Sequence, residues 1–407
     1  MLNFKKVGIV FILIILSYSG YAQETISDSR TLDRDARLFS RKAKRDSIRS
    51  NKKVWLSVLG GPSYTPEASL GIGGAVLASF KTNRHDTVSQ RSYIPAGINL
   101  SINGTVVVAG AGTLFFNENR FRIIANYGFR REPTNFYGVG FSEIDHNNNL
   151  IFNDLESDSR TSFDRTYINL TPKFLWNLGD NIFLGGLVSF NYNKILKRDS
   201  ILSAYVNAKV PGFKDKFHNL GLGAIFQYDT RNDVATPTRG LMASAVLSAY
   251  GKYLGGDYNY EILDLEYKQF QNIFKRRSTL AWVAKSQIGM GKVPFTEMPT
   301  FGSPFDLRGY TIGKYRDKSM LYSIVEYRHM FGSEKAYQEG RFYSKLGFVL
   351  WTGAGTIGKD PTEWKKWKPN YGMGIRIQIQ PNKNFRIDFG GGPKQKLGVY
   401  MNMTEAF

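Results

Sequence analysis

The chain has 407 residues, a formal net charge of +20 and no cysteine. The lack of cysteine excludes a disulfide framework, a cysteine-ligated zinc cluster and a cysteine nucleophile. The positive charge would indicate nucleic acid in a soluble protein, but the basic residues are spread along the chain and form no single stripe, so we expect no nucleic-acid partner.

The N-terminus has the pattern of an export signal. A positive segment with Lys5 and Lys6 precedes an apolar run at residues 7–16. This run is shorter than the roughly 20 apolar residues that a membrane-spanning helix needs. We therefore predict a signal peptide at residues 1–22 and a short, highly charged periplasmic segment at 23–53.

From residue 54 onward, the sequence alternates between apolar and polar residues with a period of two. In residues 372–380 the apolar side chains alternate with Gly374, Arg376 and two glutamines, and residues 385–389 repeat the pattern. Charge on the minor face is typical of a strand between an apolar and an aqueous environment. The segments run to about 9–11 residues or more, the length that a tilted membrane-spanning strand requires.

Counting these segments predicts an all-β fold, a transmembrane antiparallel β-barrel of about 16 strands over residues 54–407. Tight turns on one side alternate with long loops on the other, which is typical of barrels in the bacterial outer membrane, so we expect that localisation, with membrane lipids and lipopolysaccharide as partners. The predicted strands are 54–60, 68–80, 92–103, 105–116, 119–131, 162–177, 181–195, 217–229, 239–251, 258–273, 276–291, 317–331, 341–356, 370–380, 384–391 and 396–407.

The last predicted strand carries a further signal. Val399, Met401, Met403 and Phe407 are predicted to share one face of that strand, which ends on the aromatic residue. An alternating strand that ends in this way is similar to the sorting signal read by barrel-assembly machinery.

No arrangement of residues indicates catalysis. The four histidines are not at metal-ligand spacing, and no His-x-Glu-x-x-His pattern is present. We predict no catalytic residue, no metal site, no cofactor and no enzymatic activity.

Several motifs, in order along the chain, resemble those of the BamA/TamA family, also called the bacterial surface antigen family, of outer-membrane barrels. The resemblance covers roughly residues 54–407 and is densest after residue 221. It rests on Tyr228-Asp229-Thr230-Arg231-Asn232, Pro237-Thr238-Arg239-Gly240, Leu307-Arg308-Gly309-Tyr310, Glu326-Tyr327-Arg328, Gly372-Met373-Gly374-Ile375-Arg376 and Arg386-Ile387-Asp388-Phe389-Gly390.

The resemblance implies that the loop with Arg308, Gly309 and Tyr310 turns inward into the lumen. An arginine placed there must find a carboxylate, because an unpaired desolvated charge costs several kcal/mol. Glu326 is the expected partner of Arg308, and Asp388 is a second candidate. Without the resemblance, Arg308 would be interpreted as a solvated loop residue.

A second family element is a turn motif. Asp229, Arg231 and Gly240 match the positions of the family's Asp-Thr-Arg turn and its Pro-Thr-x-Gly continuation.

Two departures from the family pattern limit what can be transferred. Gly353 stands where the family usually carries an aspartate, so one partner of Arg308 is missing or replaced. Family members also carry periplasmic POTRA domains that receive client polypeptides, and residues 23–53 are too few for one. Periplasmic or outer-membrane partner proteins would then deliver clients.

The resemblance implies a role in inserting or translocating outer-membrane proteins or envelope components, with unfolded barrel proteins as clients. The expected mechanism is lateral opening between the first and last strands. The alternative is a pore, anchor or scaffold subunit of an outer-membrane complex without insertase activity.

Overall fold

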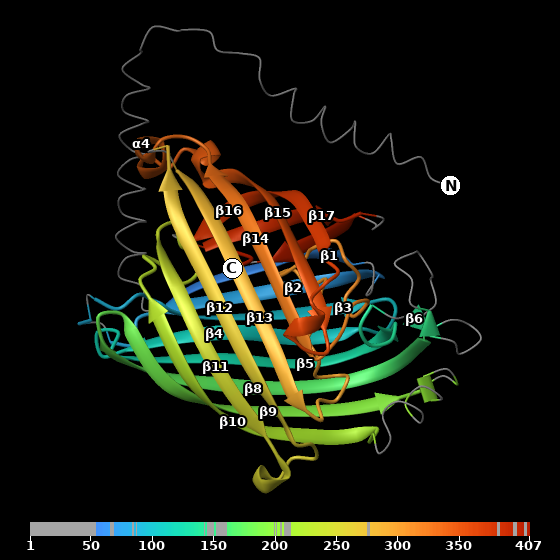
Figure 1. The fold of residues 1–407 in the computed structure, drawn as a ribbon. Coiled ribbons are helices and arrows are strands. Elements are labelled where there is room, and N and C mark those ends of the chain that lie inside the picture. The colour runs from blue at the N-terminus through green and yellow to red at the C-terminus, as the bar shows by residue number, and fades with distance from the viewer. Residues whose placement is uncertain are drawn as a thin grey trace, which may run out of the picture. The chain divides into compact units, whose positions relative to one another are not determined.

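Sixteen antiparallel strands in sequential order form one sheet, as the computed structural model in Figure 1 shows. The structure describes residues 54–407 except 66–68, 84, 87, 142, 145–149, 152–160, 199, 201, 204–205, 207–212, 275–276, 381–382, 394–396 and 403–404. The predicted signal peptide at 1–22 and the predicted periplasmic segment at 23–53 lie outside the described residues.

The predicted number of strands is confirmed. The sheet strands are β1 (Val54–Thr65), β2 (Ser69–Phe80), β3 (Ser92–Ser101), β4 (Val106–Phe116), β5 (Phe121–Phe136), β8 (Thr161–Gly179), β9 (Ile182–Leu196), β10 (Lys216–Asp229), β11 (Gly240–Tyr250), β12 (Tyr260–Ile273), β13 (Ser278–Gly291), β14 (Ser319–Met330), β15 (Leu346–Gly358), β16 (Lys368–Gln380), β17 (Lys383–Gly391) and β18 (Gly398–Asn402).

Smaller elements lie in the connections. A two-stranded sheet pairs β6 (Glu143–Ile144) with β7 (Leu150–Ile151) between β5 and β8. Helical elements in the described residues include η1 (Lys252–Leu254), α4 (Glu334–Gln338), η2 (Phe342–Lys345) and η3 (Pro361–Glu363).

Alternation produces a wall with an apolar outer face and a polar inner face. In β16, Met373 and Ile375 point outward and are exposed, whereas Arg376 points into the lumen and is buried. The same division holds at the other end of the sheet, where Leu56 and Val58 of β1 are more than half exposed. Successive side chains of a strand point to opposite faces, so a period-two sequence yields this division directly.

Tight turns join strands at one end of the sheet. Asn117, Glu118 and Asn119 have positive φ angles in the β4–β5 turn, and Asp180 and Asn181 have them in the β8–β9 turn. Asn and Asp tolerate this region better than most residues, which explains their presence in these turns. This end of an outer-membrane barrel is the periplasmic one.

The bounds of several predicted strands differ from the observed ones; for example, the strand predicted at 54–60 extends to Thr65, and the strand predicted at 119–131 extends to Phe136. The strand predicted at 341–356 begins only at Leu346, because residues 342–345 form the 3-10 helix η2. The strand predicted at 396–407 is shorter, since β18 spans only Gly398–Asn402.

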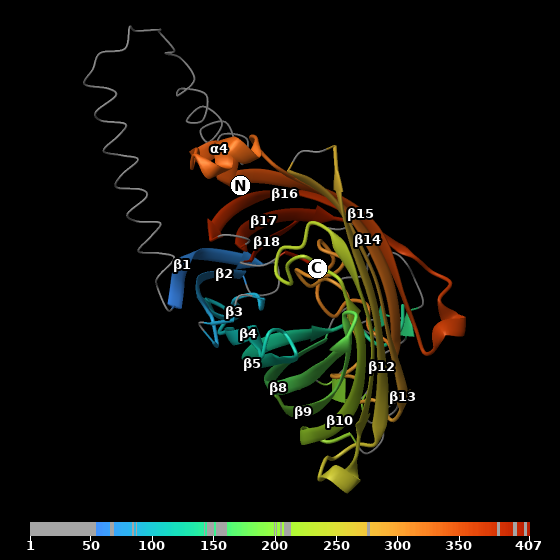
Figure 2. The same cartoon turned by 90° about the vertical axis from the view of Figure 1, so that its left-hand side faces the viewer.

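The sheet curves into a barrel whose two edge strands are β1 and β18. These strands approach each other, but β1 is hydrogen-bonded in the sheet only to β2, and β18 only to β17, within the part of the chain that the structure describes. Figure 2 shows that the orange segment between β13 and β14 lies within the curve of the sheet. In the described residues, no helix is both long and apolar enough to cross a membrane.

Candidate functional site: the lumen loop and its arginine lock

The connection between β13 and β14, residues 292–318, is the lumen loop. Its central turn is organised by Asp306, whose carboxylate accepts hydrogen bonds from the backbone N–H groups of Gly302 at 2.8 Å and Ser303 at 3.0 Å. Burial raises the pKa of the Asp306 carboxyl to about 6. This turn places Leu307 and Arg308 at the inward tip of the loop.

Arg308 is fully buried and contacts two carboxylates from different strands. Its Nη1 donates to Asp388 of β17 at 2.6 Å, and its Nη2 donates to Glu326 of β14. Its guanidinium carbon lies 3.7 Å from the ring centroid of Trp351 in β15, a cation–π contact. The pair expected between Arg308 and Glu326 is thus present, together with the second candidate, Asp388.

The two carboxylates also bind other arginines, and this arginine–carboxylate cluster extends around the inner wall. Asp388 accepts from Arg376 and Arg386, and Glu326 accepts from Arg328. Glu405 joins through a 2.9 Å contact with Arg376. The cluster therefore consists of Arg308, Glu326, Arg328, Arg376, Arg386, Asp388 and Glu405.

The cluster contains four guanidinium groups and three carboxylates. All seven residues are less than 9% exposed. Buried charges contribute little net stability when paired, but removal of one partner leaves uncompensated charge and costs about 3–5 kcal/mol. The cluster therefore favours one position of the lumen loop, while its net contribution to the stability of the whole barrel is small.

Backbone groups of the loop are held as well. The Gly309 N–H donates to the Tyr400 hydroxyl of β18 at 2.8 Å, and the Tyr310 hydroxyl donates to the Pro369 carbonyl of β16 at 2.6 Å. Arg386 donates to the Pro304 carbonyl at 2.7 Å. The loop is thereby bound to three consecutive strands at the C-terminal edge of the sheet.

The backbone conformation and close packing at Gly309 explain why the motif has glycine at this position. Its φ of +105° lies in the region that other residues disfavour. A Cβ atom there would lie 2.5 Å from the Gly390 carbonyl oxygen and 2.5 Å from the Gly391 Cα. The loop backbone therefore packs directly on the backbone of β17.

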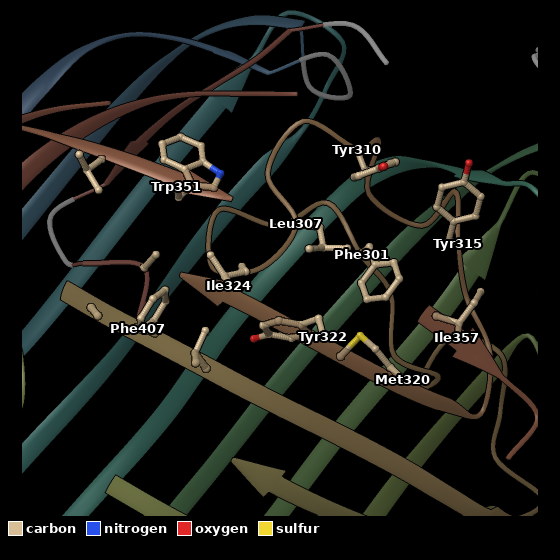
Figure 3. Packing of buried hydrophobic residues seen from close by; sticks show 14 of the residues in the cluster. Phe301, Leu307, Tyr310, Tyr315, Met320, Tyr322, Ile324, Trp351, Ile357 and Phe407 are labelled. Carbon is tan, nitrogen blue, oxygen red and sulfur yellow. The ribbon is translucent and has the colours of Figure 1, made fainter. Parts of the chain in front are cut away.

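An apolar cluster surrounds the charged one. Phe301, Leu307 and Tyr310 of the loop pack against residues of the inner wall, as Figure 3 shows. The wall contributes Met320, Tyr322, Ile324, Val349, Trp351 and Ile357, among others.

Gly353 occupies the position where the family usually has an aspartate, and the structure shows which side chain contacts Arg308 there instead. Gly353 lies in β15 two residues after Trp351, and alternation places both on the inner face. A Cβ at Gly353 would meet the Ser323 carbonyl oxygen and Ile324 of the adjacent strand. Arg308 instead has the Trp351 ring on that side, with Glu326 and Asp388 as its carboxylates.

A second attachment lies on the opposite side of the loop. Glu297 accepts a hydrogen bond from Asn193 of β9 at 2.7 Å and lies 3.5 Å from Arg165 of β8. Burial raises the pKa of the Glu297 carboxyl. The loop thus contacts both sides of the barrel.

The predicted turn motif forms a separate ion-pair group near the periplasmic end. Asp229 accepts two hydrogen bonds from the Arg231 guanidinium, at 2.8 and 3.0 Å, and one from Arg122 of β5 at 2.8 Å. Gly240 has a φ of +95°, and a Cβ there would meet the Thr230 carbonyl oxygen. These contacts tie the β10–β11 connection to β5, which is three strands from β10 in the sheet.

The C-terminal residues do not all share one strand face, which corrects the prediction for Phe407. Met401 of β18 is 51% exposed on the outside, and Val399 lies on the same strand. Phe407 lies beyond the strand and is only 9% exposed, with its ring 4.8 Å from the Arg328 guanidinium. It is buried because it packs in the lumen against this cation and Phe270. Met403 lies outside the described residues.

The sequence does not predict the contacts of several residues of the site. Arg376 and Arg386 belong to the family motifs, but their shared partner Asp388 is evident only in the structure. Glu405, Tyr400 and Trp351 have no local pattern that predicts their contacts with the lumen loop. Among the described residues, no group of His, Asp or Glu side chains could hold a metal ion.

Comparisons with known proteins identify the family. The model of the Omp85 superfamily domain matches residues 98–398. Among solved structures, BamA from Haemophilus ducreyi lacking POTRA domains 1–3 is similar with a TM-score of 0.51 and 12% identity, over 86% of this chain and 69% of that chain. CdiB from Acinetobacter baumannii is similar with a TM-score of 0.53 and 9% identity, over 87% of this chain and 60% of that chain.

These identities show a common fold alone. A search of curated protein sequences found no match. The family model, however, covers well over half of the chain, including Arg308, Glu326, Asp388 and the turn motif. The chain therefore belongs to the Omp85 superfamily, whose β-barrels are outer-membrane proteins.

Proposed function

We propose that this barrel assists the insertion or translocation of polypeptides at the bacterial outer membrane. Its work is non-enzymatic, and its substrates are unfolded outer-membrane proteins or other envelope components. Periplasmic or outer-membrane partner proteins deliver these clients, and membrane lipid and lipopolysaccharide surround the barrel.

The observation that carries the proposal is the unequal pair of edge strands. β1 has 12 residues, all paired with β2, whereas β18 has 5 residues and pairs with β17. No ladder joins β1 to β18 in the described parts of the chain. An unpaired strand edge is a template on which an incoming strand can form main-chain hydrogen bonds.

The lumen loop supports the same function. It fills the lumen beside β14 to β18 and binds β16, β17 and β18 through Pro369, Asp388 and Tyr400. The lumen loop thus holds the C-terminal strands from inside the barrel, while the edge of β1 that does not pair with β2 stays available to an incoming strand. A simple conducting pore has no need of such an arrangement.

Cross-linking of a client to the β1 edge tests the proposal. The chain has no native cysteine, so one cysteine can be introduced alone. Val58 of β1 is 65% exposed, and Leu222 of β10, in the closed part of the wall, is a matched control at 51%. An unfolded barrel protein with one cysteine in its last strand is the probe.

We expect a disulfide adduct with Val58→Cys and none with Leu222→Cys. Equal adducts at both positions would indicate non-specific contact. If neither position gives an adduct and the tagged barrel is purified without clients, the insertase function is rejected in favour of a pore, anchor or scaffold.

A further inference from the structure

A groove on the outer face of β13 and β14 carries an inference that is independent of the proposed function. In β14, Glu326 and Arg328 belong to the buried cluster in the lumen. Side chains alternate along a strand, so Tyr327 and His329 point outward. Ser278 of β13 is the direct partner of His329 in the sheet and therefore shares the outer face.

The groove has a volume of about 410 Å³ and is lined by Phe274, Ser278, Tyr327 and His329. This volume is within the range of small-molecule sites. Phe274 forms a lip that is 74% exposed, at the end of the wall where β12 turns into β13. The lining therefore combines two aromatic rings with polar groups.

The polar groups form one connected set at the base of the groove. The Ser278 hydroxyl lies 2.8 Å from His329 Nδ1, and the Tyr327 hydroxyl donates to Ser278 Oγ at 3.3 Å. Polar groups on a lipid-facing wall are expected at the depth of the headgroups and ester linkages, not at the centre of the bilayer.

Aromatic side chains surround the groove on the side of β15. The His329 ring lies 5.5 Å from Phe348 and 5.6 Å from Phe331, and Tyr327 lies 5.9 Å from Phe348. Aromatic girdles of this kind mark the membrane–water interface of outer-membrane barrels. The adjoining outer surface is apolar, with Val325 and Leu350 both more than 40% exposed.

We propose that this groove binds one glycerophospholipid of the periplasmic leaflet. The acyl chain lies against Tyr327 and the apolar wall beside it, and the ester and headgroup region lies at His329, which is nearer to the β12–β13 turn and the lip of Phe274. One observation and one physical argument select a lipid as the occupant. The groove is continuous with the exposed apolar wall at Val325 and Leu350, and a recess that hydrocarbon does not fill loses dispersion contacts with its lining.

Photo-cross-linking in lipid nanodiscs tests the site. The full chain is reconstituted in phosphatidylethanolamine that includes an analogue with a diazirine on the acyl chain, and labelled peptides are mapped by mass spectrometry. Phe274→Ala removes the lip. Phe342→Ala is the matched control, because Phe342 is 72% exposed and lies outside the groove, in η2.

We expect the acyl-chain probe to label wild type at Tyr327 more strongly than at Leu222 on the plain outer wall. Phe274→Ala should reduce groove labelling about fivefold to tenfold, the effect of removing an exposed aromatic surface that the bound lipid would cover. Phe342→Ala should label like wild type. Correct folding of each variant is checked by its heat-modifiable migration in a gel.

Tyr327→Phe separates the two parts of the site, since it removes the hydroxyl and keeps the ring. It should lower retention of phosphatidylethanolamine in native mass spectrometry while the acyl label at position 327 remains. Groove labelling equal to that at Leu222, or unchanged in Phe274→Ala, overturns the proposal. Capture of a periplasmic protein that Phe274→Ala abolishes would also overturn it.

Discussion

Arg308 in the lumen loop and Asp388 in β17 are 80 positions apart in sequence and form a fully buried ion pair of 2.6 Å. The same guanidinium reaches Glu326 of β14, so one loop residue joins two strands across β15 and β16. Withdrawal of the loop from the lumen would leave these buried carboxylates with fewer cations. The loop therefore has one strongly favoured position.

Arg308→Ala should destabilise the barrel by about 3 kcal/mol, because it removes one partner from a buried charge cluster. Arg308→Lys should recover only part of this loss, since one ammonium group cannot reproduce the forked contacts to Glu326 and Asp388. Urea unfolding in detergent, followed by tryptophan fluorescence, measures both changes. Equal stability of Arg308→Lys and wild type would show that fork geometry has no role.

Asp388→Asn should cost more stability than Glu326→Gln. Asp388 accepts from three arginines, Arg308, Arg376 and Arg386, whereas Glu326 accepts from Arg308 and Arg328. The loss of a carboxylate leaves each of its arginines without that anion in a buried site, at a total cost of about 3–5 kcal/mol for Asp388. The urea midpoints of the two variants decide this order, and the reverse order would contradict it.

Gly309→Ala should destabilise the lumen loop by more than Gly104→Ala destabilises its turn. Both glycines have positive φ, but a Cβ at Gly309 meets the backbone of β17, whereas a Cβ at Gly104 has nothing within 4 Å. Positive φ alone costs about 1 kcal/mol for alanine. Limited proteolysis of the lumen loop should show faster cleavage only in Gly309→Ala.

Asp306 should give the lumen loop a pH dependence. Its pKa is raised from 3.8 to about 6 by burial, so the folded protein binds this proton more tightly than the unfolded chain. Stability from this group is therefore greatest below about pH 4 and falls as the pH rises to about 6, by about 2 kcal/mol.

Asp306→Asn keeps an acceptor for the Gly302 and Ser303 N–H groups and removes the titration. Unfolding measured from pH 4 to pH 7 should show a steeper loss of stability in wild type than in the variant. Parallel curves for the two proteins would assign the pH dependence to other groups.

Asp229→Asn should loosen the β10–β11 connection, because Arg122 and Arg231 both lose their buried carboxylate. We expect a loss of about 3 kcal/mol. Asp215→Asn is the control, since its contact with Arg198 is at the surface, where such pairs contribute less than about 1 kcal/mol. Hydrogen exchange of residues 230–239 should rise only in Asp229→Asn.

The sequence by itself determined the strands and their order. Period-two alternation is local information, and it is enough to assign Arg376 and Asp388 to the inner face of β16 and β17. Asn and Asp in the tight turns likewise follow from a local preference, since these residues tolerate positive φ angles. The family resemblance then indicated that Arg308 lies in the lumen and faces Glu326.

Only the tertiary structure decided how the inner residues combine. Glu405 and Phe407 lie near the end of the chain, yet they contact Arg376 and Arg328 in the lumen. The Tyr400 hydroxyl accepts from Gly309, 91 positions away. Alternation predicts which face of the sheet a side chain occupies. It does not predict which distant strand or loop contacts that side chain in the lumen. That depends on the curvature of the sheet and on the buried charges that the loop has to satisfy.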